Sequence, residues 1–211
     1  MAIDAERQLF NGAPGVVAPA IDALGLAPGE RVLHIGCGLG YYTALMAHIV
    51  DPSGRVRAIE VDDTLAADSA RNLSPYSWVE VQHGNGAGPL GEPFDAVLVN
   101  AGVTHPHDTW LDALVPGGRL VLPMTATLPQ MKTIGKGLML LLTKASDEAF
   151  DVRPLTLVAI YSAVGLRDET LNEALGRALM RPPFARPTRL RRDAHDPEAS
   201  CWLHGPTFCL G

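Results

Sequence analysis

The sequence is poor in cysteine and in aromatic residues: its 211 residues include three cysteines, Cys37, Cys201 and Cys209, and only 6% Phe, Trp and Tyr. Three cysteines cannot all pair, so we exclude a disulfide-stabilised secreted scaffold and expect a reducing, cytoplasmic compartment. No apolar run approaches the roughly 18 residues of a membrane helix. The N-terminus carries Asp4 and Glu6 where a signal peptide would be apolar. We therefore expect no membrane partner.

Positive charge is also scarce, with 17 Lys and Arg against 23 Asp and Glu and a net charge of −6. Because nucleic-acid binding needs a local excess of basic side chains, we expect no nucleic-acid partner. One basic cluster, Arg186, Arg189, Arg191 and Arg192, is expected to be solvated surface. The remaining composition, 47% hydrophobic and 19% charged, is ordinary for a soluble globular protein.

The first half of the chain alternates β-rich runs with helical runs. Strands are predicted over residues 31–35, 55–59, 78–81, 94–99 and 119–122, and helices over residues 41–50, 65–73 and 109–114. Alternation with short connections predicts a parallel sheet that is covered by helices on both faces.

The second half has a different pattern. Residues 138–143 and 155–161 are β-like runs with no helix between them, which predicts an antiparallel hairpin at the sheet edge. A helix over residues 168–179 should end at Arg181-Pro182-Pro183. We therefore predict an α/β, Rossmann-like fold with a mostly parallel seven-stranded sheet. Residues 1–180 would form the domain, and residues 181–211 a C-terminal extension packed on it.

A glycine-rich loop joins the first predicted strand to the first predicted helix. Gly36, Gly38 and Gly40 let the backbone turn sharply against a ligand, and the helix N-terminus offers free N–H groups. Glu60 follows 20 residues after Gly40, at the end of the second strand, where a carboxylate can accept ribose hydroxyls. The pattern favours a nucleoside-containing ligand over a plain turn with a surface Glu. Tyr41 stands at the third glycine of the dinucleotide fingerprint and would obstruct close helix packing. That substitution and the lack of a second domain disfavour a nicotinamide-dependent oxidoreductase.

Longer segments resemble a known family. Residues 31–43 (RVLHIGCGLGYYT) and 54–60 (GRVRAIE) resemble the first motifs of the protein-L-isoaspartate O-methyltransferases, which are class I S-adenosylmethionine-dependent methyltransferases. Residues 84–88, 94–100 and 114–123 resemble later motifs of that family. The resemblance implies S-adenosyl-L-methionine as the cofactor and a carboxylate of a peptide or protein as the favoured methyl acceptor.

The resemblance also implies a site layout. The glycines would cradle the methionine end, Glu60 would hold the ribose, and Val61 would pack on the adenine. Gly84 and Asn85 would lie beside the adenine edge, and Asn100 would lie near the transferred methyl as a candidate catalytic residue. The complete implied cofactor-binding set is Gly36, Cys37, Gly38, Gly40, Tyr41, Glu60, Val61, Gly84, Asn85 and Asn100.

Three positions depart from the family pattern. His34 replaces an acid, Asn85 replaces an Asp, and residues 11–15 (NGAPG) lack the Thr-Ile-Ser segment that helps to position an isoaspartyl substrate. We therefore expect little activity on isoaspartyl peptides. A non-catalytic S-adenosylmethionine-binding protein stays open as an alternative.

Two histidines bear on the acceptor. His105, the second candidate catalytic residue, and His107 follow the strand at residues 94–99 and could supply a general base. A carboxylate acceptor needs no base, whereas a hydroxyl acceptor does. The alternatives are an O-methyltransferase for a small hydroxylated metabolite, or a polar loop that caps the next helix.

The C-terminal segment contains His195, Cys201, His204 and Cys209. All four residue types can bind zinc, but their spacing matches none of the usual paired zinc patterns, so no metal site is predicted and zinc binding stays open as an alternative. We expect both cysteines to be small buried residues in short apolar strands.

Overall fold

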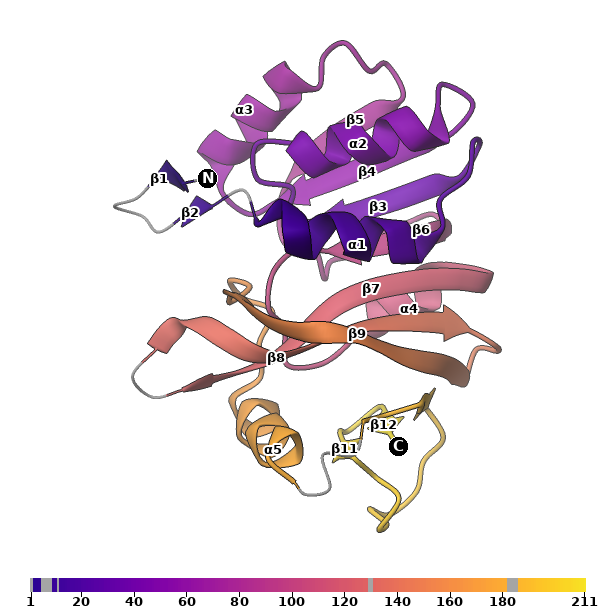
Figure 1. Cartoon of the computed structure of the whole chain (residues 1–211). Coiled ribbons are helices and arrows are strands. Elements are labelled where there is room, and N and C mark those ends of the chain that lie inside the picture. Colours follow the sequence, from indigo (N-terminus) through magenta and orange to yellow (C-terminus); the bar gives the residue numbers. More distant parts are fainter. Residues whose placement is uncertain (1, 5–8, 11, 129–130, 182–185) are drawn as a thin grey trace.

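A computed structural model describes the chain except residues 1, 5–8, 11, 129–130 and 182–185, so Asn11, Pro182 and Pro183 of the predicted segments lie outside it. One sheet runs through the molecule in the strand order β11-β12-β10-β9-β8-β7-β6-β3-β4-β5. Five neighbouring strands are parallel (Figure 1): β5 (Val79–His83), β4 (Arg55–Glu60), β3 (Arg31–Ile35), β6 (Phe94–Val99) and β7 (Leu114–Leu128).

The other half of the sheet is antiparallel. Its strands are β8 (Met131–Lys144), β9 (Ala149–Tyr161), β10 (Arg189–Arg191), β12 (Cys209–Leu210) and β11 (Leu203–His204). A separate small hairpin joins β1 (Ala2–Asp4) to β2 (Leu9–Phe10). The α/β class and the edge hairpin are confirmed. The large sheet has ten strands and not seven, because the C-terminal segment adds three short strands beyond the hairpin.

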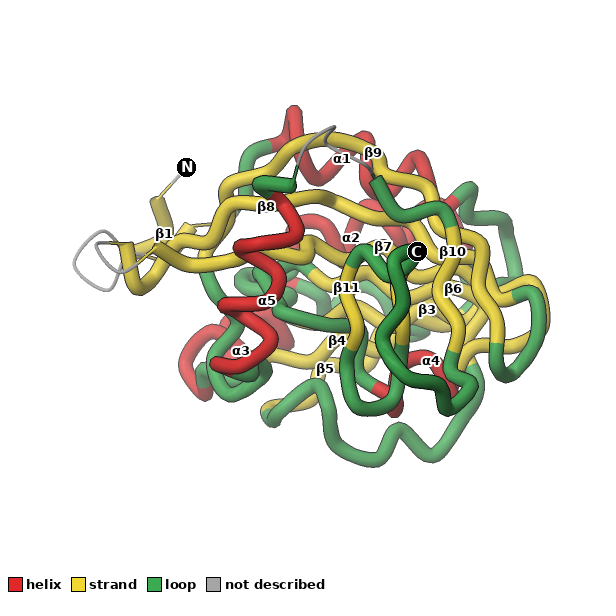
Figure 2. Tube along the Cα trace, turned by 90° about the horizontal axis from the view of Figure 1, so that it is seen from below, coloured by secondary structure: helices red, strands yellow, loops and turns green. Residues whose placement is uncertain are grey.

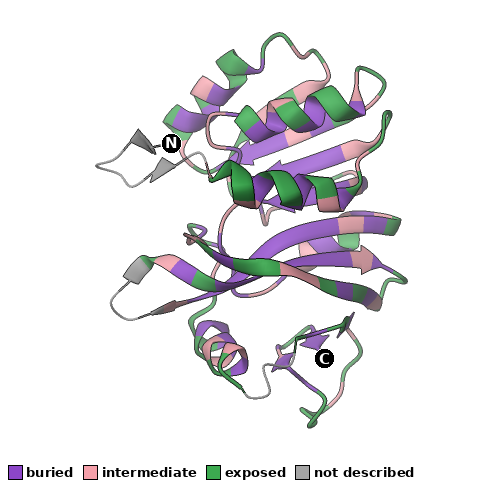
Figure 3. Cartoon of the chain, in the orientation of Figure 1, coloured by how far each residue is buried: buried purple, intermediate pink, exposed green. Residues whose placement is uncertain are grey.

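Helices cover both faces of the sheet. They are α1 (Pro14–Leu24), α2 (Tyr41–Val50), α3 (Asp63–Asn72), α4 (Asp108–Ala113) and α5 (Glu169–Leu179). On one face, α1 and α2 bury Leu24, Tyr42 and Met46 against alternate residues of the parallel strands such as Val32 and Leu98. Figure 3 shows these strands buried and the outer sides of the helices exposed. No helix in the described ranges is long and apolar enough to cross a membrane.

The sequence analysis missed α1. Pro14, Gly15 and Pro19 are residue types that favour loops, although proline is well tolerated in the first turn of a helix, where Pro14 lies. The apolar residues Val17, Ile21 and Leu24 carry the helical spacing that marks this segment.

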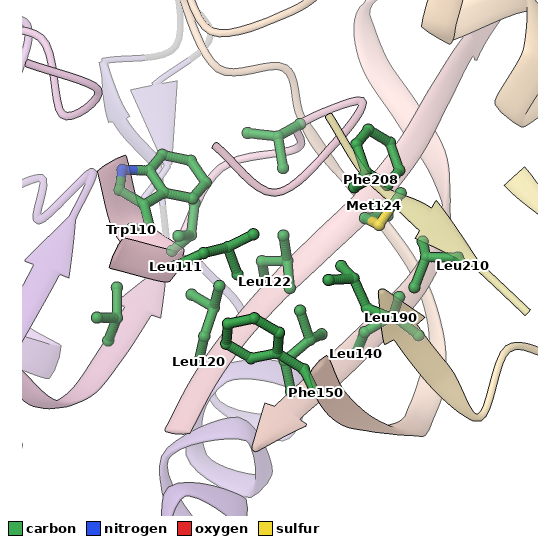
Figure 4. Packing of buried hydrophobic residues seen from close by; sticks show 14 of the residues in the cluster. Trp110, Leu111, Leu120, Leu122, Met124, Leu140, Phe150, Leu190, Phe208 and Leu210 are labelled. Carbon is green, nitrogen blue, oxygen red and sulfur yellow. The ribbon is translucent and has the colours of Figure 1, made fainter. Parts of the chain in front are cut away.

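The opposite face holds the larger core. Trp110 and Leu111 of α4 pack on β7, and the same cluster includes Phe150, Leu190 and Phe208 (Figure 4). Viewed from below, α5 and β11 lie side by side under the sheet (Figure 2). Side chains of α4 and of the C-terminal strands therefore share one hydrophobic core with the parallel strands.

Two long strands contain irregularities. The fifth strand was predicted at residues 119–122, but β7 begins at Leu114. Leu114 already pairs with Phe94 of β6, and the Pro116–Gly118 segment then interrupts the pairing before it resumes at Arg119. Gly117 has a φ of 77°, which glycine adopts without strain. In β9, Pro154 lies opposite Leu140 beside a register shift, and only residues 149–151 pair with β10.

His34 joins β3 to α2. Its side chain is fully buried, and its Nδ1 lies 2.8 Å from Oγ1 of Thr43 in the first turn of α2. Burial lowers the pKa of His34 to about 3, because an apolar surrounding disfavours the charged imidazolium. The neutral ring therefore takes the place of the acid that the family pattern has at this position.

We expect this burial to make stability depend on pH. The unfolded chain protonates His34 near pH 6.5 and the folded chain does not, so the free energy of unfolding should fall as pH drops below that value. The contribution from His34 should be about 1.3 kcal/mol between pH 7 and pH 5.5. Urea unfolding at both pH values measures it. His34→Gln should lose this part of the pH dependence, whereas Thr43→Val should be destabilised but should keep it. Equal pH dependence in His34→Gln and the unmodified protein would contradict the expectation.

Candidate active site

The carboxyl ends of the parallel strands form one wall of a cavity of about 380 Å³. In sheets of this kind ligands bind at that edge. The lining residues come from the ends of β3 and β4, the start of α3, the loops that follow β3, β4, β5 and β6, and the end of β9 with the residues after it. They are Ile35, Gly36, Gly38, Ile59, Glu60, Val61, Asp62, Leu65, Gly84, Asn85, Gly86, Asn100, Ala101, Tyr161, Ser162, Ala163, Val164 and Leu166.

The glycine loop has a backbone that only glycine adopts without strain. Gly36, Gly38 and Gly40 have φ values of 77°, 57° and 86°. Gly36 and Gly38 line the cavity, and the Gly36 N–H donates to the Ile59 carbonyl at 2.8 Å. Gly40 has a different role, since a Cβ there would lie 2.8 Å from Oγ of Ser69 in α3. Gly40 therefore permits the close packing of α2 on α3.

Glu60 is the buried carboxylate of the site, with 7% of its surface exposed. Its Oε2 accepts a hydrogen bond from the Gly38 N–H at 2.8 Å. Its Oε1 accepts from the N–H groups of Val61 at 2.9 Å and Asp62 at 3.2 Å. The side chain thus joins the glycine loop to the end of β4 and lines the cavity between them.

Asn85 and Gly86 form the adjoining wall. Oδ1 of Asn85 accepts from the Ala87 N–H at 2.9 Å, which shapes the turn. A Cβ on Gly86 would lie 2.5 Å from Cγ2 of Ile35, so glycine allows this loop to approach β3. Trp110 fixes the loop from behind, because its Nε1–H donates to the Gly86 carbonyl at 2.7 Å.

Asn100 lines the cavity directly after β6. Its N–H donates to the Ile35 carbonyl at 2.9 Å, and its Oδ1 would lie 3.6 Å from a Cβ built on Gly12. The Tyr42 hydroxyl donates to the Gly12 carbonyl at 3.4 Å. The structure therefore places the segment before α1 beside Asn100.

The wall formed by the end of β9 was missed by the sequence analysis. Tyr161 and the residues that follow it lie far along the chain and form no motif. Ser162 contributes an Oγ that is buried and has no hydrogen-bond partner among the described residues. A hydrogen-bonding ligand in the cavity could satisfy that hydroxyl.

Besides Gly40, three predicted site residues do not line the cavity. The Cys37 thiol points toward Oγ of Ser69 at 3.5 Å, and burial raises its pKa to about 11. Tyr41 is 52% exposed and packs edge-on against Tyr42. The tight glycine contact of this loop falls at Gly40, against Ser69 and Leu73, and not at Tyr41. The third is His105.

His105 and His107 are held by their own loop. Nδ1 of His105 lies 2.9 Å from Oγ1 of Thr104, and its ring stacks on Phe208 with centroids 6.2 Å apart. Burial, and then the neighbouring His107, lower the pKa of His105 to about 4. His107 donates from Nε2 to the Leu166 carbonyl at 3.1 Å. Both imidazoles stabilise the loop after β6 and lie outside the cavity lining.

The fold and this cavity define a Rossmann-like protein with a nucleoside-type site. A sequence profile of the protein-L-isoaspartate(D-aspartate) O-methyltransferase family (PCMT) matches residues 1–157. The chain belongs to this family.

Individual relatives support the same family assignment. A protein-L-isoaspartate O-methyltransferase from Methylorubrum populi is 34% identical over 158 residues, covering 72% of this chain and 70% of the relative. One from Aeropyrum pernix is 39% identical over 127 residues, covering 58% and 49%. The chain spans about half the length of several curated relatives that it matches.

Solved structures share the fold. One protein-L-isoaspartate O-methyltransferase superposes with a TM-score of 0.64 at 27% identity, covering 78% of this chain and 50% of the other. The Plasmodium falciparum PCMT structure, in complex with S-adenosyl-L-homocysteine, gives a TM-score of 0.61 at 22% identity, covering 72% and 74%.

We expect His105 to stay neutral from pH 5 to pH 8, because its pKa is lowered to about 4. Ring-proton NMR, with the resonance assigned from His105→Gln, measures this pKa. His107→Gln should raise it only part of the way to the ordinary value, since burial is the larger cause. A midpoint near the ordinary value of about 6.5 in the unmodified protein would show that the ring is solvated.

Proposed function

We propose that this protein is an S-adenosylmethionine-dependent methyltransferase that methylates a carboxylate of a peptide or protein. The observation that carries the proposal is the cavity in which the glycine-loop backbone, the Glu60 carboxylate and Asn100 meet, in a member of this family. Its volume of about 380 Å³ falls within the range of small-molecule and cofactor sites.

The lining residues fit the cofactor in chemical type. Gly36 and Gly38 line the cavity without a Cβ and so leave room for the methionine end, and the Glu60 carboxylate can accept ribose hydroxyls. Val61, which is 43% exposed, offers an apolar surface for the adenine ring. The unpartnered Oγ of Ser162 adds a hydrogen-bonding group on the wall that follows β9.

When bound, S-adenosylmethionine supplies an electrophilic methyl group on its sulfonium sulfur. The residues of this chain then have to hold the acceptor in line with that methyl and exclude water. Asn100 lines the cavity beside the N-terminal segment, so we assign it to acceptor positioning. Gly12 and its neighbours would border the acceptor on that side.

The ionisable groups of the lining favour a carboxylate acceptor. They are Glu60, Asp62 and Tyr161, and Glu60 is already engaged with the glycine loop. A hydroxyl acceptor would need a base. The two candidate bases, His105 and His107, are hydrogen-bonded to the Thr104 hydroxyl and the Leu166 carbonyl. A carboxylate is anionic near neutral pH, since its pKa is about 4, and needs none.

We expect Glu60→Ala to weaken S-adenosylhomocysteine binding roughly 10- to 150-fold, the loss for hydrogen bonds to a charged group. Isothermal titration calorimetry measures the affinity. Glu80→Ala removes an exposed carboxylate outside the cavity and should leave the affinity unchanged. NAD should not bind. Tight NAD binding without an S-adenosylhomocysteine signal would refute the cofactor assignment.

We expect the methylated product to be a carboxyl ester. With methyl-labelled cofactor and carboxyl-bearing peptides, the label should be lost in mild base as methanol, and the rate should vary little from pH 6 to pH 8. Isoaspartyl peptides should be poor acceptors relative to an ordinary family member, because residues 11–15 lack the Thr-Ile-Ser segment. His105→Gln should act only through packing.

Two results would contradict the carboxylate proposal. A base-stable product whose rate rises with pH and falls about 10²–10⁴-fold in His105→Gln would indicate a hydroxyl acceptor with a histidine base. Cofactor binding with no product from any carboxyl or hydroxyl acceptor would indicate a binding protein.

A further inference from the structure

A second group of functional side chains lies in the C-terminal segment, outside the cavity. His195, Cys201, His204 and Cys209 each offer one ligand atom, and these four atoms all lie within 4.8 Å of one another. From this convergence we propose that the four residues bind one zinc ion in a closed, structural site. The sequence spacing predicted no metal site, so the structure revises that expectation.

The local fold explains why the spacing was uninformative. His204 and Cys209 pair directly across the short β11–β12 hairpin, so a four-residue turn brings them together. The loop before β11 folds back and places His195 beside Cys201, with Nε2 and Sγ 3.8 Å apart. Two ligands therefore come from the hairpin register and two from the loop, and neither pair forms a C-x-x-C motif.

The distances suit zinc. In a tetrahedral site with Zn–S near 2.3 Å and Zn–N near 2.0–2.1 Å, neighbouring ligand atoms are about 3.3–3.8 Å apart. The His195–Cys201 separation of 3.8 Å already matches this spacing, and the 4.8 Å limit leaves only a small contraction for the others.

Hydrogen bonds outside the cluster orient two of the ligands. Nδ1 of His195 lies 2.9 Å from the Asp193 carbonyl, which can only accept, so Nδ1 carries the proton. Nε2 then presents its lone pair toward Cys201, the arrangement common in metal-bound histidines. Sγ of Cys201 accepts from the Glu198 N–H at 3.3 Å, a contact that stabilises a thiolate.

The other two ligands, His204 and Cys209, come from the β11–β12 hairpin. Nδ1 of His204 is buried and has no hydrogen-bond partner among the described residues. Cys201 and Cys209 are 7% and 2% exposed, and both are free thiols. A bound cation would engage both thiols and one ring nitrogen of His204. Two thiolates and two neutral imidazoles would also balance its charge.

The donor set selects the metal and its role. Two sulfur and two imidazole ligands favour zinc among the common divalent ions. Four protein ligands leave no open position, so the role is structural. The strands of this segment have two or three residues each, too short to be stable without a crosslink or packing. Phe208 lies between His204 and Cys209 and stacks on His105, so the ion would also steady the loop after β6.

The test begins with metal content and coordination. Full-length protein purified in reducing, zinc-containing buffer should hold close to one zinc ion per chain by elemental analysis. Zinc-free protein titrated with Co²⁺ should show a thiolate-to-cobalt charge-transfer band and the intense visible bands of tetrahedral cobalt, both abolished by one equivalent of Zn²⁺.

Matched variants locate the site. Cys201→Ser, Cys209→Ser and His204→Gln should each lose the bound zinc, and Cys37→Ser and His48→Gln should retain it, since neither residue belongs to the cluster. The cobalt titration uses the unmodified chain, so it tests the proposal even if a variant does not fold. The proposal is overturned if reduced protein gives no cobalt–thiolate band. It is also overturned if Cys201→Ser and Cys209→Ser keep their zinc, or if the two thiols are isolated as a disulfide with no metal.

Discussion

The Glu60 carboxylate accepts hydrogen bonds from three backbone N–H groups, one in the glycine loop and two at the end of β4. Because charge-assisted hydrogen bonds of this type are stronger than neutral ones, they hold two separate loops in one arrangement. The positive φ angles of Gly36 and Gly38 are tolerated within that arrangement. The cavity wall between the glycine loop and the end of β4 follows from it.

Sequence patterns predicted the helices and strands whose conformation is decided by residues close by in the chain. The strands at residues 31–35 and 94–99 and the helix at residues 41–50 were predicted residue for residue, since their apolar spacing and flanking glycines agree. Gly36, Gly38 and Glu60 line the cavity because a strand, a turn and the next strand place them there directly. No prediction was made for the helix α1, whose helical apolar spacing is interrupted by Pro14, Gly15 and Pro19.

Features that depend on distant segments could not be predicted from one sequence. His105 stacks on Phe208, about a hundred residues away, so its side-chain direction is decided by the C-terminal hairpin. Ser162 lines the cavity only because the long β8–β9 hairpin returns to the end of β6. His204 and Cys209 meet through strand register, which the residue types do not specify.

The irregularity at Pro154 has a consequence for association between molecules. Beyond residue 152, no strand in the described part of the chain lies along the outer edge of β9, and this strand exposes Leu157. An open apolar edge can template pairing with a neighbouring chain. Pro154 has no N–H to donate, Arg153 brings charge, and the register shift bends the ladder. The protein can therefore leave this edge uncovered without offering a straight strand to another copy of itself.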